Sequence, residues 1–202
     1  MKPKYALAVF DIGGVLADLT GFPEIAQWTG LTTEAAKSHW TKIEVVREFE
    51  LGQISYEAFA ENLLRELKLS YSIEELRNHM EAWMTGLFPN AESIIEQVKQ
   101  RIDVACLSNM NAVQWPILRD NFGIGAWFSN QFVSHEIGKL KPEQAAYEAV
   151  SEKLGIAPEK ILFFDDNQDN IAGAKKAGWT SYLVQSTTEL SIELRKLKLL
   201  SL

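Results

Sequence analysis

The chain has 202 residues, 47% of them hydrophobic, which suits one domain or one core with a sizeable insertion. Its formal net charge is −7, and it has no lysine- or arginine-rich block that would attract a phosphate backbone. We therefore expect a globular protein with no nucleic-acid partner.

The N-terminal region and the cysteine content bear on location. Residues 1–11 contain two lysines and an apolar run shorter than the roughly 7–15 residues of a signal-peptide core. No stretch approaches the roughly 18 apolar residues of a membrane span. The only cysteine, Cys106, excludes an internal disulfide. We expect a cytoplasmic protein with no membrane partner.

The first predicted strand, residues 6–10, is followed by a long interruption of the strand pattern. Residues 17–88 show no convincing strand, and their amphipathic spacing predicts helices over 32–52, 55–69 and 72–87. Two of these segments begin with helix-capping patterns built on serine or threonine. We therefore expect an all-helical insertion directly after the first strand.

Beyond residue 88, short apolar runs alternate with helical patterns. Strands are predicted at 104–107, 131–134, 160–164 and 181–184, and helices at 91–101, 141–155 and 169–178. Runs that are apolar at nearly every position are typical of strands covered on both faces of a parallel sheet. The pattern predicts an α/β fold, a Rossmann-like parallel sheet whose ligands bind at the carboxyl ends of the strands.

Polar side chains follow three of the predicted strands, and one more lies in a loop before a helix. They are Asp11, Ser108, Asn109, Lys141, Asp165 and Asp166. Each alone has an ordinary explanation as a turn, cap or solvated residue, but the ordered set predicts one converging site. Three close carboxylates require a cation, and Mg²⁺ leaves coordination positions for a substrate phosphate. The ammonium, hydroxyl and main-chain amides suit phosphate oxygens, which leaves Asp11 to attack phosphorus.

Four segments together resemble a known family. VFDIGGVL (9–16), CLSN (106–109), GKLKPE (138–143) and ILFFDDNQDNIAGAKKAG (161–178) are similar, in order, to the four motifs of the haloacid dehalogenase-like (HAD) hydrolase superfamily, whose members are mostly phosphatases. The resemblance implies an α/β core domain over 1–16 and 89–202 and a small helical cap domain over 17–88. Within the superfamily, the chain looks closest to bacterial sugar-phosphate phosphatases, including α-glucose-1-phosphate phosphatase, and to the N-terminal phosphatase domain of epoxide hydrolases.

The resemblance also implies roles for individual residues. Asp11 would be the nucleophile that becomes an aspartyl phosphate, and Lys141 and Ser108 would bind the phosphoryl group with Asn109 beside them. The implied magnesium ligands are Asp11, the main-chain carbonyl of Gly13, Asp166 and, directly or through water, Asp165. The expected activity is that of a Mg²⁺-dependent phosphatase of a small phosphorylated metabolite, possibly a sugar phosphate.

Gly13 departs from the pattern, because most phosphatases of this superfamily have an aspartate there that protonates the leaving oxygen. Such assistance contributes about 10²- to 10⁴-fold in rate. The substrate then has a good leaving group, such as an anomeric or acyl phosphate, or another acid replaces the aspartate, or turnover is slow or absent. The candidate replacement acids are Asp18, His39, Glu44 and Glu50, and the candidate cap residues for substrate contact are His39, Trp40, Arg47 and Trp83.

Two other functions stay open from the sequence. A 2-haloacid dehalogenase also lacks the aspartate at Gly13, but it works without metal, and Asp165 with Asp166 would only repel its carboxylate substrate. A non-catalytic binding or regulatory protein would keep the fold and lose turnover. Retention of Asp11, Lys141 and both metal acids favours the phosphatase. The oligomeric state is not assigned.

Overall fold

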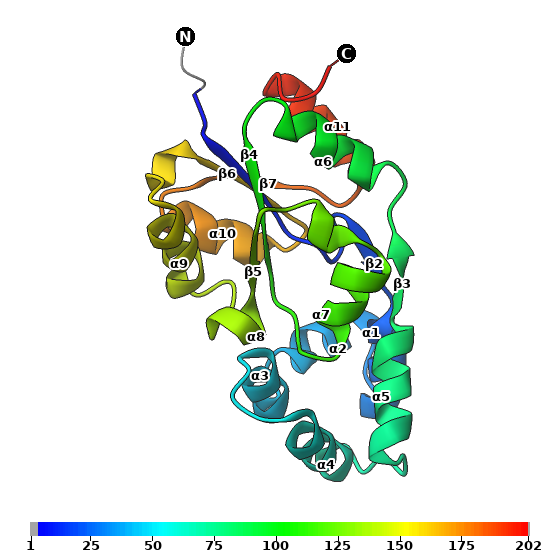
Figure 1. Ribbon diagram of the computed structural model, residues 1–202. Coiled ribbons are helices and arrows are strands. Elements are labelled where there is room, and N and C mark those ends of the chain that lie inside the picture. The colour runs from blue at the N-terminus through cyan, green and yellow to red at the C-terminus, as the bar shows by residue number, and fades with distance from the viewer. Residues whose placement is uncertain (1–3, 202) are drawn as a thin grey trace.

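A five-stranded parallel sheet forms the centre of the computed structural model, which describes residues 4–201 (Figure 1). Its strand order is β5-β4-β1-β6-β7. The strands are β1 (Leu7–Phe10), β4 (Asp103–Ser108), β5 (Asn130–Val133), β6 (Ile161–Asp165) and β7 (Thr180–Leu183). All five lie where the apolar runs predicted them, so the predicted Rossmann-like α/β fold is confirmed.

Helices cover both faces of this sheet, which explains why its strands are apolar throughout (Figure 1). They are α6 (Ala91–Lys99), α9 (Gln144–Leu154), α10 (Gln168–Lys176) and α11 (Thr187–Lys196). Successive side chains of a strand point to opposite faces. Leu7 and Val9 accordingly pack in one apolar cluster with α9 and α10. Ala8 and Phe10 pack in the other with α6 and α11.

The register of β1 fixes where its polar successor lies. Phe10 pairs with Cys106 of β4 on one side and with Phe164 of β6 on the other. Asp11 therefore emerges between the ends of β4 and β6, and its main-chain nitrogen donates to the carbonyl of Phe164 at 2.9 Å. The central strand thus delivers this carboxylate to the carboxyl edge of the sheet.

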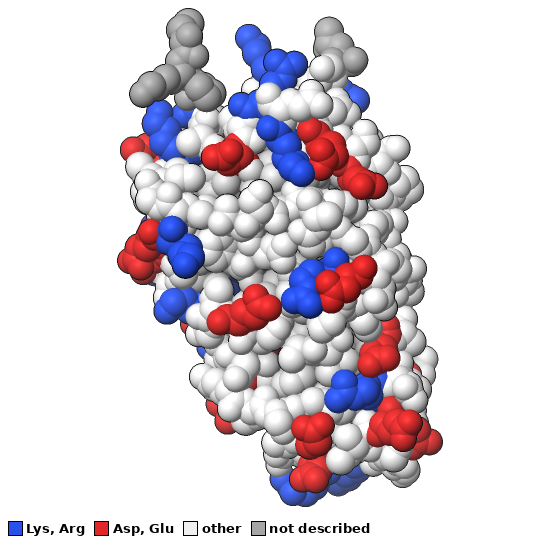
Figure 2. Space-filling view, in the orientation of Figure 1, with Lys and Arg blue, Asp and Glu red and all other residues white. Residues whose placement is uncertain are grey.

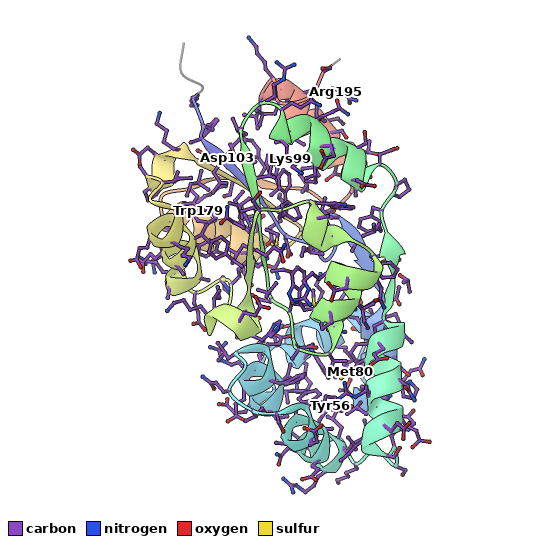
Figure 3. All side chains as sticks on the ribbon, in the orientation of Figure 1. Tyr56, Met80, Lys99, Asp103, Trp179 and Arg195 are labelled. Carbon is purple, nitrogen blue, oxygen red and sulfur yellow. The ribbon has the colours of Figure 1, made fainter. Side chains whose placement is uncertain are left out.

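Residues 17–88 lie at that edge as a mainly helical segment (Figure 1). Its helices are α1 (Gly21–Thr29), α2 (Thr33–Trp40), α3 (Glu44–Glu50), α4 (Tyr56–Glu66) and α5 (Ile73–Ala82). Ser72 and Glu75 form the predicted capping box, with hydrogen bonds of 2.7 and 3.1 Å. The side chains of Tyr56 and Met80 point into this segment, whereas Trp179 packs beside the sheet (Figure 3).

The expectation of a purely helical insertion was wrong at the two ends of the segment. β2 (Ala17–Leu19) and β3 (Met84–Leu87) pair there as a two-stranded antiparallel sheet. The helix predicted over 72–87 stops at Ala82, because the weak helix formers Thr85 and Gly86 follow and belong to β3, which pairs with β2 instead. The two strands connect the helices to the core.

The helix predicted over 32–52 is also interrupted. α2 ends at Trp40 and α3 begins at Glu44, with a turn between them. The break leaves both Trp40 and Ile43 buried, and the hydrophobic stabilisation from their burial offsets the loss of helical hydrogen bonds. The break also determines which side chains of α3 face the core, and therefore which of them can reach the site described below.

Shorter elements complete the chain. They are α7 (Gln114–Pro116), a π-helical turn (Ile117–Asn121), 3₁₀ turns (Ile124–Ala126 and Pro158–Lys160) and α8 (Ser134–Ile137). Within residues 4–201, no helix is long and apolar enough to cross a membrane. Acidic and basic side chains are interspersed on the face in Figure 2, which shows no continuous basic patch.

Candidate active site

Four buried polar side chains form a connected network at the carboxyl edge of the sheet. Ser108, the last residue of β4, donates a hydrogen bond to Asp11 Oδ1 at 2.7 Å. Lys141 Nζ lies 3.0 Å from Asp11 Oδ1 and 2.6 Å from Asp165 Oδ2. The Lys141 side chain is only 1% exposed. The ends of β1 and β6 and the loop that carries Lys141 therefore meet at the Lys141 ammonium group.

Burial and charge act against each other in this network. Burial raises the pKa of Asp11 to about 7 against the opposing effect of Lys141, and the Asp165 and Asp166 carboxylates add to the increase. Burial alone would lower the pKa of Lys141, but the Asp11 and Asp165 carboxylates outweigh it and raise that pKa. Lys141 is therefore held as a cation, while ionised Asp11 is costly unless further positive charge lies nearby.

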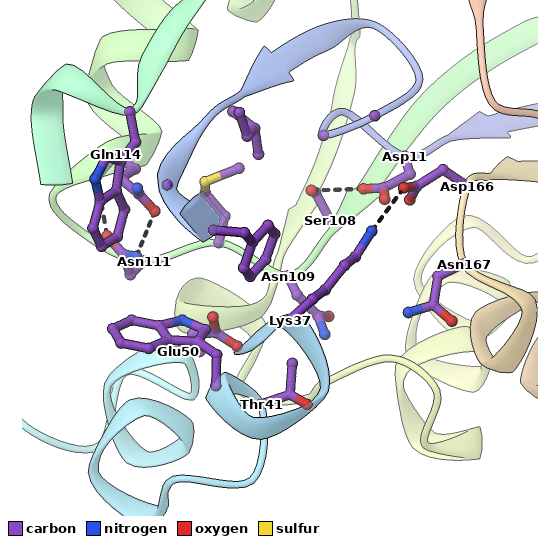
Figure 4. A pocket seen from close by; sticks show the side chains of 18 of the residues that line it. Asp11, Lys37, Thr41, Glu50, Ser108, Asn109, Asn111, Gln114, Asp166 and Asn167 are labelled. Carbon is purple, nitrogen blue, oxygen red and sulfur yellow. Dashed lines mark hydrogen bonds and ion pairs between the residues drawn. The ribbon is translucent and has the colours of Figure 1, made fainter. Parts of the chain in front are cut away.

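Asp165 and Asp166 are adjacent in sequence but differ in environment. Asp165 is fully buried, and besides Lys141 it accepts from the Asn167 main chain at 2.8 Å and from the Asn170 side chain at 3.0 and 3.1 Å. Asp166 is 21% exposed and faces the pocket, where Lys37 of α2 donates to it at 3.1 Å (Figure 4). Asp165 is therefore suited to orient the neighbouring side chains, whereas Asp166 is suited to bind a metal ion directly.

The donor set suits a hard divalent cation. Carboxylate oxygens of Asp11, Asp165 and Asp166 lie within 4.8 Å of one another. The hydrogen bonds of the adjacent turn use the carbonyls of Ile12 and Ala17, and no described residue donates to the carbonyl of Gly13. Oxygen-only donors of this kind are those that Mg²⁺ prefers.

Asn109 lines the pocket and hydrogen-bonds the main chain of Lys141. Its side chain donates to the main-chain carbonyl of Lys141 and accepts from the main-chain nitrogen of Lys141, both at 2.9 Å. The loop after β4 is further held by Ser134, whose hydroxyl exchanges two 2.9 Å hydrogen bonds with the main chain of Met110. The Asn109 side chain therefore fixes the backbone from which Lys141 extends.

Two glycines of the first turn are closely packed. A Cβ on Gly13 would lie 2.5 Å from Leu19 Cδ1, so a β2 side chain fills the space that a residue there would use. Gly14 has a φ of +75°, and a Cβ on it would lie 2.6 Å from Asp166. Gly13 is thus covered by an apolar side chain, and Gly14 allows Asp166 to approach the turn.

A pocket of about 250 Å³ opens between the sheet edge and the helical segment. Asp11, Ser108, Lys141 and Asp166 line one end of it. Residues of the helical segment and of the loop after β4 also line the pocket: Trp40, Glu50, Trp83, Asn111 and Gln114. In Figure 4, Asn111, Gln114 and Glu50 lie across the pocket from Asp11. The pocket can therefore hold a phosphate at one end and the rest of a small molecule at the other.

The structure distinguishes among the candidate acids and the candidate substrate-contact residues of the helical segment. Trp40, Trp83, Asp18 and Glu50 line the pocket, whereas His39, Glu44 and Arg47 do not. Arg47 pairs instead with Glu143 of the core. Asp18 is exposed to solvent, but burial raises the pKa of Glu50 to about 7 despite the opposing effect of Arg47.

The sequence analysis missed several polar residues of the site, among them Asn111, Asn170, Lys37 and Gln114. Asn170 has the clearest signal, because an asparagine in the first turn of α10 is placed to reach back to Asp165. Lys37 and Gln114 carry no local signal, since both act across long sequence distances. Gln114 hydrogen-bonds Asn111 at 2.7 Å and the Met80 carbonyl at 3.2 Å, so it links the core loop to α5.

Comparison with known proteins supports the resemblance. A family model described as hydrolase, haloacid dehalogenase-like hydrolase, matches residues 5–178. Phosphatase MT3486 of Mycobacterium tuberculosis is 33% identical over 193 residues, which cover 87% of this chain and 85% of the relative.

Solved structures of low sequence identity share the fold. A HAD family enzyme of Bacteroides thetaiotaomicron, in complex with magnesium and inorganic phosphate, has a TM-score of 0.74 at 20% identity, covering 89% of this chain and 93% of that one. L-2-haloacid dehalogenase of Xanthobacter autotrophicus has a TM-score of 0.68 at 20% identity, covering 98% and 85%. From its sequence match and its fold, the chain belongs to the haloacid dehalogenase-like hydrolase family.

Proposed function

We propose that this protein is a Mg²⁺-dependent phosphatase that hydrolyses a small phosphorylated metabolite, such as a sugar phosphate, through an aspartyl phosphate on Asp11. The observation that carries the proposal is the joint placement of Asp11, Asp166 and Lys141 at one end of the pocket, with the buried Asp165 carboxylate beside them. The 33% identity to a protein named as a phosphatase supports the same reaction class. We also propose that 17–88 acts as the cap domain over a core of 1–16 and 89–202.

In the proposed reaction, Asp11 is both the nucleophile and the floor of the phosphate site. Its free carboxylate oxygen forms a bond to phosphorus as the bond from phosphorus to the leaving oxygen breaks, and water then releases phosphate from Asp11. Ser108 holds Asp11 Oδ1 in place, and Lys141 neutralises charge on Asp11 and on the transferring oxygens. Asn109 keeps the Lys141 backbone in position through its paired hydrogen bonds.

The magnesium ligands in this proposal are Asp11, Asp166 and the Gly13 carbonyl, with Asp165 orienting the set through its hydrogen bonds. When bound, the metal supplies positive charge that keeps Asp11 ionised and screens the phosphate. Lys37, whose ammonium pairs with Asp166, adds positive charge to the pocket lining beside these ligands.

Leaving-group chemistry is constrained by the apolar cover over Gly13. Gly13 has no side chain to protonate the leaving oxygen, and Leu19 fills the space that the Cβ of an acid at position 13 would occupy. Substrates with a good leaving group, such as anomeric or acyl phosphates, therefore suit this site best.

A dehalogenase is the alternative within the same fold. The contacts of Asp165 and Asp166 weigh against it, because a 2-haloacid carboxylate would enter a site that already holds three acidic groups.

Phosphate release tests the proposal. Purified protein is given α-D-glucose 1-phosphate, acetyl phosphate and p-nitrophenyl phosphate, with Mg²⁺ or with EDTA. We expect release that requires Mg²⁺, is lost in Asp11→Asn and persists in Asp103→Asn, a matched change of an exposed carboxylate at the start of β4. Chloride release from 2-chloropropionate with no phosphate release from any ester would overturn the phosphatase in favour of a dehalogenase.

A further inference from the structure

Glu50 is an acid of the pocket wall that the proposed chemistry does not use. It is the last residue of α3 and lines the pocket. Among residues 4–201, its carboxylate has no hydrogen bond or ion pair, because Arg47, one turn earlier on α3, pairs with Glu143. The Glu50 carboxyl is therefore available to hydrogen-bond a molecule bound in the pocket.

The charges around the pocket restrict what that molecule can be. The two lysines of the lining are already paired, Lys141 with Asp11 and Asp165, and Lys37 with Asp166. On the wall across from Asp11, Glu50 is the charged residue. A second anionic group on the substrate would therefore meet a carboxylate there and no unpaired cation of the described lining.

The shape and chemistry of the same wall favour a hydroxyl-rich group. Trp40 and Trp83 pack edge to face, with ring centroids 5.9 Å apart, and both line the pocket. Aromatic faces suit the C–H faces of a sugar, and neighbouring polar side chains fix its orientation. The amides of Asn111 and Gln114 supply such groups beside Glu50, and each has a free N–H after its internal bonds are counted.

We propose that Glu50 is a specificity-determining residue that hydrogen-bonds a hydroxyl of an uncharged, hydroxyl-rich leaving group and rejects phosphate esters that carry a second anionic group. This inference rests on the proposed phosphatase function and narrows its substrate to monophosphates of sugars or polyols. Because burial raises its pKa to about 7, Glu50 is partly protonated near neutrality and can both accept and donate a hydrogen bond to a hydroxyl.

Two substitutions separate charge from hydrogen bonding. Glu50→Gln keeps a hydrogen-bonding group and removes the charge, and Glu50→Leu removes both. Glu48→Gln is the matched control, because Glu48 lies on the same helix outside the pocket lining. Each variant is assayed for kcat/KM on α-D-glucose 1-phosphate, phosphoglycolate and p-nitrophenyl phosphate, the last of which has neither hydroxyls nor a second anion.

The expected results are changes in substrate ratio. In Glu50→Leu, kcat/KM for glucose 1-phosphate relative to p-nitrophenyl phosphate falls about tenfold, and in Glu50→Gln it falls about threefold or less. Both substitutions raise the relative kcat/KM for phosphoglycolate at least about fivefold, because a repulsive charge is lost. Glu48→Gln leaves all ratios unchanged. Equal effects on all three substrates, or none, would overturn the specificity role.

Failure of the phosphatase proposal gives a different pattern. If the wild type releases no phosphate from any ester, calorimetric binding of glucose 1-phosphate to Asp11→Asn decides the inference by itself. Weaker binding in the Asp11→Asn, Glu50→Leu double variant supports the contact with Glu50. Equal binding in both variants, or no binding to either, overturns it.

Discussion

Replacing Lys141 by methionine tests the electrostatic account of the site without any substrate. Lys141 Nζ is 3.0 Å from Asp11 and 2.6 Å from Asp165, and these side chains are only 10% and 0% exposed. Methionine fills the apolar path of the lysine stem but leaves two carboxylates buried without their cation. Breaking a buried ion pair in this way costs about 3–5 kcal/mol. That is a large share of the roughly 5–15 kcal/mol that stabilises a typical domain.

Lys37→Met is the matched control, because it removes a lysine from the same carboxylate cluster at the surface. The Lys37 and Asp166 side chains are 48% and 21% exposed, so solvent screens their attraction. Exposed pairs contribute about 0–1 kcal/mol. The two lysine-to-methionine changes are therefore expected to differ several-fold in their effect on the free energy of unfolding.

The pH dependence of the Lys141→Met deficit follows from Asp11. Its folded-state pKa is raised from 3.8 to about 7 by burial, so protonation makes the buried group neutral in the folded state over that range. A raised acid pKa gives stability that is present below the unfolded value and is lost as pH rises through the folded value. The deficit of Lys141→Met therefore grows as pH rises through about 7, where Asp11 becomes ionised in the folded wild type and Lys141 stabilises that charge.

Urea unfolding in EDTA, followed by tryptophan fluorescence, measures these free energies, since the chain has six tryptophans. Circular dichroism confirms that each variant is folded before urea is added. The reasoning is refuted if Lys141→Met loses no more stability than Lys37→Met near about pH 8, or if its deficit is larger at low pH.

Three further predictions concern the metal and the first turn. Mg²⁺ at a hundred times its Kd stabilises the folded wild type by about 2.7 kcal/mol and so raises its thermal midpoint. We expect no such rise for Asp166→Asn, and equal shifts in both proteins would contradict direct ligation by Asp166. The double variant Gly13→Asp, Leu19→Ala places a carboxyl in the space that Leu19 now fills, and we expect kcat for substrates with poor leaving groups to rise up to about 10²-fold. A folded double variant with no gain in kcat would refute the view that Leu19 takes the space of an acid. Gly14→Ala, at a φ of +75° and against Asp166, lowers stability by about 1–3 kcal/mol in urea unfolding and weakens the Mg²⁺ shift; an unchanged variant would refute the close approach.

The strands of the core were readable from sequence because both faces of the sheet are covered. Continuous apolar runs such as 160–164 then carry a strong local signal. β2 and β3 were missed for the opposite reason, since they are three and four residues long and pair across the whole helical segment. Only the tertiary structure shows that Thr85 and Gly86 belong to a strand.

The candidate site was readable in part for a related reason. Polar residues at the ends of buried strands, such as Asp11 and Asp165, converge in any parallel sheet, so their meeting follows from topology. The direction in which a helical residue faces does not follow in this way. The sequence could not separate Glu50 from Glu44, because their positions depend on the turn that ends α2 at Trp40.

Covalent trapping is the most direct test of the central claim that Asp11 carries the phosphoryl group. Protein turning over acetyl phosphate with Mg²⁺ is quenched in acid and reduced with borohydride, which converts an aspartyl phosphate to homoserine, and the peptides are analysed by mass spectrometry. The account predicts homoserine at position 11, formed only with Mg²⁺ and absent from Lys141→Met. Phosphate release without any such conversion, or conversion at Asp165 or Asp166 instead, would contradict it.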